Sequence, residues 1–195
     1  IREPAVSGLF YPKEGSILTQ LIKFYFESIS CEHKEKKIKA LITPHAGYTY
    51  SGQIAAYSFK EISKNDYDTI FILGPSHYHY FKGLSLYDGV GYKTPFGVIP
   101  IDQQSITKIL GEDDTFYYEE QAHLKEHSIE VELPFLQYIY TKLPQIVPII
   151  IGDSTVDKLK KLSTIIHEIS TQKKCLVIAS SDFSHFFSYE TACEM

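Results

Sequence analysis

The chain of 195 residues has 44% hydrophobic residues, a formal net charge of −5 and three cysteines without a CxxC pair. This length is typical of one domain with a sizeable core, and the acidic balance argues against a nucleic-acid binder because no basic stripe is available to neutralise phosphates. The sequence shows no signal peptide, no apolar run near the roughly 18 residues of a membrane span and no disulfide framework, so we expect a cytoplasmic protein.

Helix-like and strand-like patterns alternate along the chain. In order, the predicted elements are helix 16–29, strand 38–43, helix 52–63, strand 69–74, a β excursion within 82–101, helix 103–110, a helix beginning near residue 133, strand 146–151, helix 155–169 and strand 175–180. The strands are continuously apolar, which is typical of strands covered on both faces. Ser154, with Asp157 three residues on, is the expected N-cap of helix 155–169. The pattern predicts one α/β domain with a central, mostly parallel or mixed sheet flanked by helices.

Three histidines follow predicted strands. His45, His77 and His185 each lie a few residues beyond the carboxyl end of an apolar run. In open α/β sheets, ligands bind outside the carboxyl ends of the strands. If these strands are neighbours, the three imidazoles converge on one cleft.

The local sequence around the first two of these histidines supports a site at a strand end. Pro44 stops the strand before His45, and Gly47 allows a close backbone approach. The alternative for His45 is a loop histidine bonded to nearby backbone. His77 and His79 alternate, so in an extended segment they face opposite ways. We therefore expect His77 in the cleft and His79 at its rim or on the surface.

A fourth candidate, His127, lies in the stretch "KEHSIEVELPF". In a helix, His127 and Glu130 would share a face, and Pro134 fits the first turn of a helix that begins near Leu133. The alternative is a polar helix start with no chemical role. His123 has no supporting pattern, and we expect it on the surface.

Asp182 and His185 lie together in "SSDFSH". A carboxylate near an imidazole can fix its tautomer and raise its basicity. With Ser180, Ser181 or Ser184 the same spacing could form a Ser-His-Asp triad, but no GxSxG elbow is present to support a serine hydrolase.

Imidazoles together with a carboxylate or thiolate are the usual ligands of zinc, iron and copper. The sequence has no HExxH, Walker A or GxGxxG motif, so a helix-borne zinc protease site and nucleotide binding have no support. The residues alone therefore indicate an α/β domain with a histidine-rich cleft that could bind a metal.

Five motifs resemble, in order, those of the Memo family. They are "REPAVSGLFYP" at 2–12, "PHAGYTYSG" at 44–52, "ILGPSHYHY" at 72–80, "EHSIEVELPF" at 126–135 and "SSDFSHF" at 180–186. Bacterial and archaeal members are often labelled AmmeMemoRadiSam system protein B, and the first motif looks more like a prokaryotic than an animal member. The resemblance spans essentially the whole chain. It implies a fold similar to the class III extradiol dioxygenases, which use non-haem Fe(II) to open catechol rings.

The resemblance also assigns roles to residues. His45 and His77 match the two metal-ligating histidines. His185 looks like the pocket histidine that acts as acid or base in the dioxygenases, and His127 matches another histidine of that pocket. The expected neighbours in or around the pocket are Asp182, Glu130 and His79. The implied metal is Fe(II) or copper, with zinc less favoured.

Family members are usually longer than this chain. We therefore expect residues 1–195 to form a single Memo-like domain that lacks its C-terminal third, where the last metal ligand of the relatives lies. Cys193 follows the "SSDFSH" motif too closely to be that ligand.

Two functions from different classes remain. The first is a metal-dependent oxidoreductase, redox or oxygenase-like, with iron or copper at His45 and His77. The second is a non-catalytic binding or adaptor protein that reuses the cleft, and metal-assisted hydrolysis is a third, minor alternative. A small molecule or peptide is the expected ligand of the cleft. The resemblance also implies radical-SAM and AMMECR-type proteins as partners, and no nucleic acid or membrane partner is expected.

Overall fold

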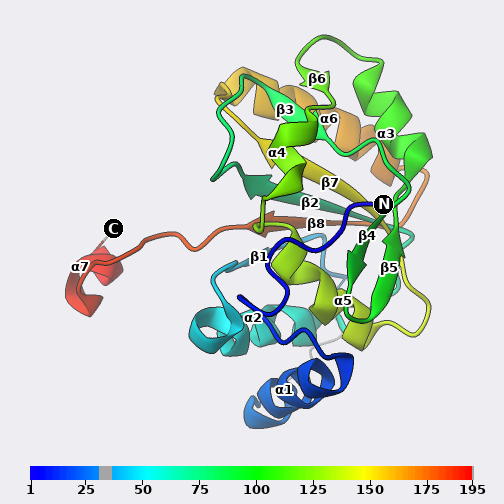
Figure 1. The fold of residues 1–195 in the computed structure, drawn as a ribbon. Helices are drawn as coiled ribbons and strands as arrows, with labels where there is room; N and C mark the ends of the chain where they lie inside the picture. Colours follow the sequence, from blue (N-terminus) through cyan, green and yellow to red (C-terminus); the bar gives the residue numbers. More distant parts are fainter. Residues whose placement is uncertain (31–36, 195) are drawn as a thin grey trace.

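A six-stranded mixed sheet forms the centre of the computed structural model, which describes residues 1–30 and 37–194 (Figure 1). In spatial order the strands are β1 (Ala40–Thr43), β8 (Cys175–Ser180), β2 (Thr69–Pro75), β7 (Gln145–Ile151), β3 (Leu84–Leu86) and β6 (Phe116–Tyr117). The first four strands are parallel, whereas β3 runs antiparallel to β7 and parallel to β6. The predicted α/β domain with a mixed sheet is confirmed.

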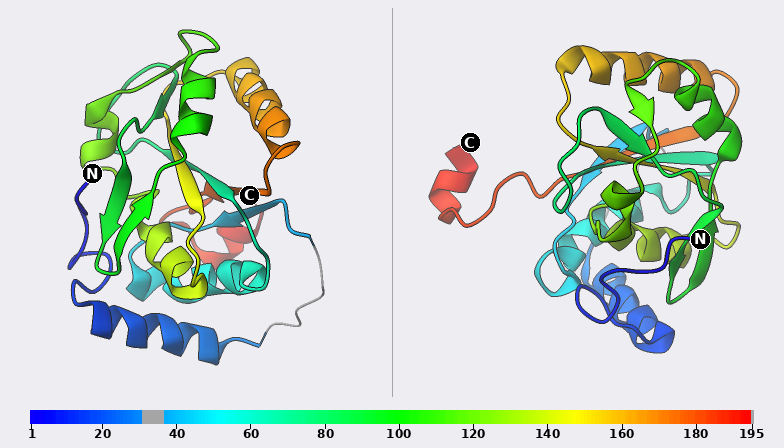
Figure 2. Two further views of the ribbon diagram at one scale, coloured as in Figure 1. Left: turned by 90° about the vertical axis from the view of Figure 1, so that its right-hand side faces the viewer. Right: turned by 45° about the horizontal axis from the view of Figure 1, so that its top comes forward.

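Helices cover the two faces of this sheet (Figures 1 and 2). One layer holds α1 (Gly15–Ser28), α2 (Tyr48–Ile62) and α5 (Leu133–Ile139), and the other holds α3 (Gln103–Leu110) and α6 (Val156–Ser170). Within the layers, α2 packs on α1 and α5, and α3 packs on α6. The remaining elements are the hairpin of β4 (Gly91–Thr94) and β5 (Gly97–Pro100), the short helix α4 (Glu120–Leu124), the 3₁₀ turn η1 (Glu130–Glu132) and helix α7 (Tyr189–Glu194).

The helices form where apolar residues recur at helical spacing. In α1, Leu18, Ile22 and Tyr25 fall on one stripe and are buried, as the pattern predicts. Helix α6 begins one residue later than expected. Thr155, rather than Ser154, is its N-cap, and its hydroxyl accepts a hydrogen bond from the backbone of the first turn. Both residues are good caps, so the sequence alone did not separate them.

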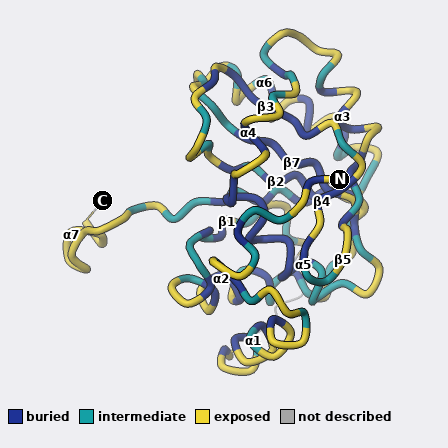
Figure 3. Tube along the Cα trace, viewed as in Figure 1, coloured by how far each residue is buried: buried dark blue, intermediate teal, exposed yellow. Residues whose placement is uncertain are grey.

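The central strands of the sheet are covered on both faces, whereas the edge strand β1 is not. Strands β2 and β7 are almost entirely buried, whereas β1 exposes Ile42 to 51% (Figure 3). The prediction that 38–43 is covered on both faces is therefore wrong for β1. A continuous apolar run does not distinguish an edge strand from a central one, because the pattern carries no information about neighbours.

The segment 82–101 forms strands, as expected, and contributes β3, β4 and β5. The short elements β6 and α4 were not predicted, because two and five residues are too few to show a period. Among the described residues, no helix combines the length and the apolar character needed to cross a membrane.

The last described segment leaves the body of the molecule. After β8, residues 181–194 lead outward, and α7 stands apart from the two layers (Figures 1 and 2). No residue of α7 is buried. Phe183 and Phe186 adopt φ values of 60° and 64°, a left-handed conformation that is uncommon for residues other than glycine.

Candidate metal centre

Three histidines meet at the carboxyl ends of the sheet strands. His45 follows β1 and His77 follows β2, while His127 comes from the segment between α4 and η1. The ring centroids of His45 and His77 are 5.1 Å apart, those of His45 and His127 are 5.6 Å apart, and those of His77 and His127 are 4.5 Å apart. One ligand atom from each side chain lies within 4.8 Å of the other two, so the cluster could hold one metal ion.

The cluster is buried on two sides and open on the third. His45 and His127 are 2% and 8% exposed, whereas the side chain of His77 is 35% exposed. Solvent or a substrate can therefore reach the cluster past His77. A metal site with three protein ligands and an open side is the arrangement that catalytic ions require.

Glu126 holds His77 in place through both its backbone and its ring. The carboxylate accepts a hydrogen bond from the His77 backbone N–H at 2.6 Å and lies 2.9 Å from Nδ1 of the ring. Burial raises the pKa of Glu126, but the hydrogen bonds from His77 and Ser128 outweigh it and lower the pKa to about 2. An ionised Glu126 accepts a hydrogen bond from the protonated Nδ1 of His77, so Nε2 keeps its lone pair for a ligand.

Glu126 also organises the third histidine. Its Oε1 accepts hydrogen bonds from the backbone N–H groups of His127, at 2.8 Å, and Ser128, at 2.9 Å. Burial lowers the pKa of His127 to about 4, so this imidazole is neutral at pH 7. Its buried Nδ1 lies 3.5 Å from Oε1 of Glu126 but forms no hydrogen bond with any described residue. A neutral imidazole with an unpartnered nitrogen fits a metal ligand.

His45 is fixed by Ser180, the last residue of β8, and by Asp182, which follows the strand. Its Nδ1 lies 2.8 Å from the Ser180 hydroxyl oxygen, and Oδ1 of Asp182 accepts a hydrogen bond from the His45 backbone N–H at 2.6 Å. Burial lowers the pKa of His45, against the raising effect of Asp182. Because β1 and β8 are paired in parallel, the residues beyond their ends meet at this edge.

The three segments of the site are pressed closely together. A Cβ on Gly74, in β2, would lie 2.4 Å from the hydroxyl oxygen of Ser128, and that hydroxyl donates to the Pro75 carbonyl at 2.9 Å. Glycine at this position therefore lets the segment that carries His127 approach the end of β2.

His185 lies at the edge of the cluster. Its Nε2 is 3.4 Å from Oδ2 of Asp182, and its side chain is 54% exposed. The same Oδ2 is 3.8 Å from Nε2 of His45. Asp182 thus connects the two histidines, and His185 stands on the segment that leads away from the body of the molecule.

Of the two further residues predicted in or around the pocket, His79 lines the pocket beside His77, whereas the carboxylate of Glu130 has other partners. Glu130 is fully buried, but its carboxylate pairs with Arg2 and accepts from Tyr11, away from the three histidines. The backbone makes a helical turn from His127 to Val131, but Arg2 and Tyr11, rather than the histidines, hold the Glu130 carboxylate. His79 is partly exposed, and its Nε2 lies 3.7 Å from Glu119.

His123 is buried, so the expected surface position is wrong. It is 1% exposed, with Ser85 at 2.9 Å from Nε2 and Tyr92 at 2.8 Å from Nδ1. Its backbone carbonyl accepts from Arg2. These partners lie far away in the sequence, so no local pattern indicated them.

The sequence interpretation assigned no role in a metal site to three polar residues around the cluster. Glu126 and Glu132 flank His127 in the motif "EHSIEVE", and Ser180 was considered only as a triad serine. The one available signal was the presence of three glutamates in an apolar segment, because buried carboxylates need partners. Spacing alone did not show which of them faces the histidines.

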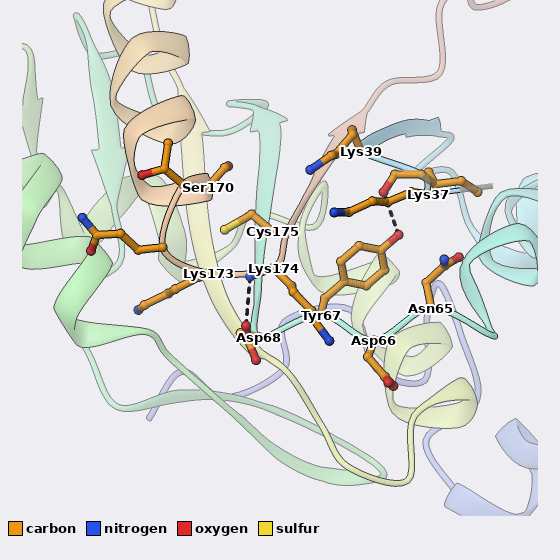
Figure 4. A pocket seen from close by; sticks show the side chains of 13 residues that line it. Lys37, Lys39, Asn65, Asp66, Tyr67, Asp68, Ser170, Lys173, Lys174 and Cys175 are labelled. Atoms are coloured by element: carbon orange, nitrogen blue, oxygen red, sulfur yellow. Dashed lines mark hydrogen bonds between the residues drawn. The ribbon is translucent and has the colours of Figure 1, made fainter.

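A second pocket lies at the opposite end of the same strands. It has a volume of about 410 Å³ and is lined by residues that precede β1, β2 and β8 (Figure 4). Lysines and aspartates mix along its walls, and Lys174 donates from its backbone to Asp68 at 2.9 Å. This pocket shares no residue with the histidine cluster.

The comparisons with known proteins agree on one family. A family model described as Memo-like protein matches residues 2–194. A MEMO1 family protein of Aquifex aeolicus is 38% identical over 196 residues, which cover 98% of this chain and 70% of the relative. A protein with the same description from Desulfurococcus amylolyticus is 37% identical over 200 residues, which cover 97% of this chain and 71% of the relative. Another, from Nitrosopumilus maritimus, is 33% identical over 196 residues, which cover 95% of this chain and 69% of the relative.

Proposed function

The chain belongs to the Memo family, and we propose that it is a metal-dependent redox protein with oxygenase-like chemistry. In this proposal His45 and His77 bind iron or copper, and His127 completes the donor set. The observation that carries the proposal is the convergence of three imidazole ligand atoms within 4.8 Å of one another. Imidazole suits iron, copper and zinc alike, so the choice of iron or copper rests on the family resemblance.

The surrounding residues support this function. Glu126 orients His77 and leaves Nε2 available, as a carboxylate behind a metal-binding histidine commonly does. A bound iron or copper ion would supply one-electron chemistry and polarise a substrate oxygen. In this proposal His185, which lies 3.4 Å from Asp182, gives a proton to the substrate or takes one from it.

The substrate side is the open side of His77. A pocket of about 350 Å³ adjoins this histidine and is lined by Tyr78, Tyr80 and Phe81, among others. An aromatic small molecule or an extended peptide fits such a surface. Radical-SAM and AMMECR-type proteins remain the partners we propose from the family resemblance.

Anaerobic titration with Fe(II), Cu(I) and Zn(II), each followed by calorimetry, tests the metal site. We expect tight binding of iron or copper by the wild-type chain and its loss in the His45→Ala/His77→Ala double variant. His79→Ala is the matched control, because His79 also has an acidic partner but lies at the rim. If the wild-type chain binds none of the three ions, the metalloprotein proposal is wrong and a metal-free binding or adaptor role is favoured.

A second variant tests the support from Glu126. Glu126→Gln keeps the size of the side chain but removes the charge that holds the Nδ1 proton of His77. We expect metal affinity to fall about 10–100-fold, measured in the same titration. Glu119→Gln, beside His79, should leave the affinity unchanged. Equal affinity of Glu126→Gln and wild type would contradict the assigned role of Glu126.

A further inference from the structure

Three groups surround the hydroxyl of Ser180. Its oxygen lies 2.6 Å from the Ser128 carbonyl oxygen, 2.8 Å from Nδ1 of His45 and 2.9 Å from Oε1 of Glu132. Ser180 is 4% exposed, so these protein groups, rather than bulk water, satisfy it. The distances are all within hydrogen-bond range.

The three contacts can all be hydrogen bonds in only one way. A serine hydroxyl has one proton to donate and two lone pairs that accept. The Ser128 carbonyl can only accept, so it takes the proton of Ser180. His45 and Glu132 must then both donate to Ser180, which requires a proton on Nδ1 of His45 and a proton on the Glu132 carboxyl.

The environment of Glu132 fits a neutral acid. Its side chain is fully buried, it forms no ion pair with any described residue, and its Oε2 has no hydrogen-bond partner among them. An ionised carboxylate in this position would lack a counter-charge, and among the described residues only the hydroxyls of Ser180 and Thr43 could donate to it. Complete burial also raises the pKa of Glu132 well above its ordinary value.

The opposite tautomer of His45 is less well accommodated. A proton on Nε2 would point toward Oδ2 of Asp182, which is 3.8 Å away and beyond hydrogen-bond distance. Nδ1 would then become an acceptor, and the single proton of Ser180 could not serve both Nδ1 and the Ser128 carbonyl.

We propose that Ser180 and Glu132 are positioning residues for His45. Neutral Glu132 donates to Ser180, Ser180 donates to the Ser128 carbonyl, and His45 donates from Nδ1 to Ser180. Both lone pairs of the Ser180 oxygen are then occupied, and Nε2 of His45 keeps the lone pair that binds a ligand. The importance of that lone pair rests on the proposed metal function, whereas the hydrogen-bond arrangement itself does not.

Nitrogen-15 NMR on the metal-free, histidine-labelled chain tests the tautomer at pH 7. We expect the His45 resonances, assigned by their loss in His45→Ala, to show the proton on Nδ1. In Ser180→Ala the acceptor is gone, and the proton should move to Nε2. Ser85→Ala removes the serine that contacts His123 instead and should leave His45 unchanged. A wild-type His45 protonated on Nε2 would overturn the proposal, even if Ser180→Ala does not fold.

Infrared difference spectroscopy tests Glu132 directly. The spectrum of wild type minus Glu132→Gln should contain the carbonyl band of a protonated carboxylic acid at pH 7. A difference spectrum with only carboxylate bands would show that Glu132 is ionised and would overturn its role as donor.

Metal titration separates this proposal from the proposed function. Among Fe(II), Cu(I) and Zn(II), the ion that wild type binds most tightly should bind to Ser180→Ala about 10–100-fold more weakly than to wild type. If the wild-type chain binds no metal but His45 carries its proton on Nδ1, the metal function fails and the positioning of His45 stands.

Discussion

At the scale of single residues, His123 shows how burial changes the behaviour of an imidazole. The ring is held between Ser85 and Tyr92, and the backbone carbonyl is bound to Arg2. Burial, assisted by the charge of Arg2, lowers the pKa of His123 to about 3. The residue therefore stays neutral in the folded chain over a wide range of pH and acts in the structure rather than in the metal site.

This pKa predicts a loss of stability in mild acid. The unfolded chain binds a proton at His123 near the ordinary pKa of 6.5, whereas the folded chain does so only near 3. The stability contributed by neutral His123 is thus fully present above pH 6.5 and is lost as the pH falls toward 3. The expected slope is up to about 1.4 kcal/mol per pH unit from this one group.

Urea unfolding at pH 7 and pH 5, followed by circular dichroism, measures the effect. His123→Gln removes the titrating group. Between pH 7 and pH 5, the free energy of unfolding of wild type should therefore fall by about 2 kcal/mol more than that of His123→Gln. His79→Gln, at a partly exposed position, should behave like wild type. The same pH dependence in wild type and His123→Gln would show that His123 is not responsible.

Residues near one another in the sequence were easier to place than residues with distant partners. His45 and His77 were expected beyond the ends of two strands, and the structure has both there. His123 was expected on the surface because its partner Arg2 is 121 residues away. Ser180 and Glu126 were overlooked for the same reason, since their contacts with His45 and His77 depend on how β1, β2 and β8 pair.

At the scale of elements, the N-terminal segment is tied to the segment that carries His127. Arg2 pairs with Glu130, and both side chains are at most 2% exposed. Glu130 also accepts from the backbone of Ala5 at 2.8 Å and from the Tyr11 hydroxyl at 2.5 Å. Arg2 binds the Glu126 carbonyl as well. The N-terminal segment therefore supports the backbone next to the metal centre.

We expect Arg2→Ala to cost about 3–5 kcal/mol of stability, because it leaves Glu130 buried without its counter-charge. Chemical unfolding at pH 7 measures the cost, and Arg2→Ala/Glu130→Gln should recover part of it. Lys93→Ala is the matched control. It breaks the exposed Lys93–Glu3 pair and should cost at most about 1 kcal/mol. Equal costs for Arg2→Ala and Lys93→Ala would contradict a buried ion pair that holds the N-terminal segment.

The major elements could be predicted from the sequence, whereas their exact contacts could not. Apolar runs and helical spacing indicated the four parallel strands β1, β2, β7 and β8 and the helices α1, α2, α3 and α6, because these patterns reflect local geometry. The role of Glu130 could not be derived this way. Helical spacing from His127 pointed Glu130 toward the cluster, but its carboxylate is held by Arg2 and Tyr11, which lie 128 and 119 residues away in the sequence.

At the scale of the whole molecule, several large apolar side chains are exposed on one side of the fold. They belong to the edge strand β1, to α2 and to the segment after β8, and Figure 3 shows exposed stretches along the segment after β8. Ile42 in β1 is 51% exposed, and the α2 residues Tyr50 and Ile54 are 87% and 59% exposed. In the segment after β8, Phe183 is 80% exposed, and the side chain of Phe186 is fully exposed.

An exposed edge strand beside apolar side chains promotes association between chains. We therefore expect sedimentation velocity to show a larger mean size as the concentration of this chain rises. Ile42→Lys combined with Phe186→Ser should reduce the association, because a lysine on an edge strand opposes strand pairing. Val156→Lys changes an equally exposed residue, 67% accessible, in the α6 layer on the other face of the sheet, and should have no effect. Association that persists in the Ile42→Lys/Phe186→Ser variant, or that Val156→Lys also abolishes, would place the contact on another surface.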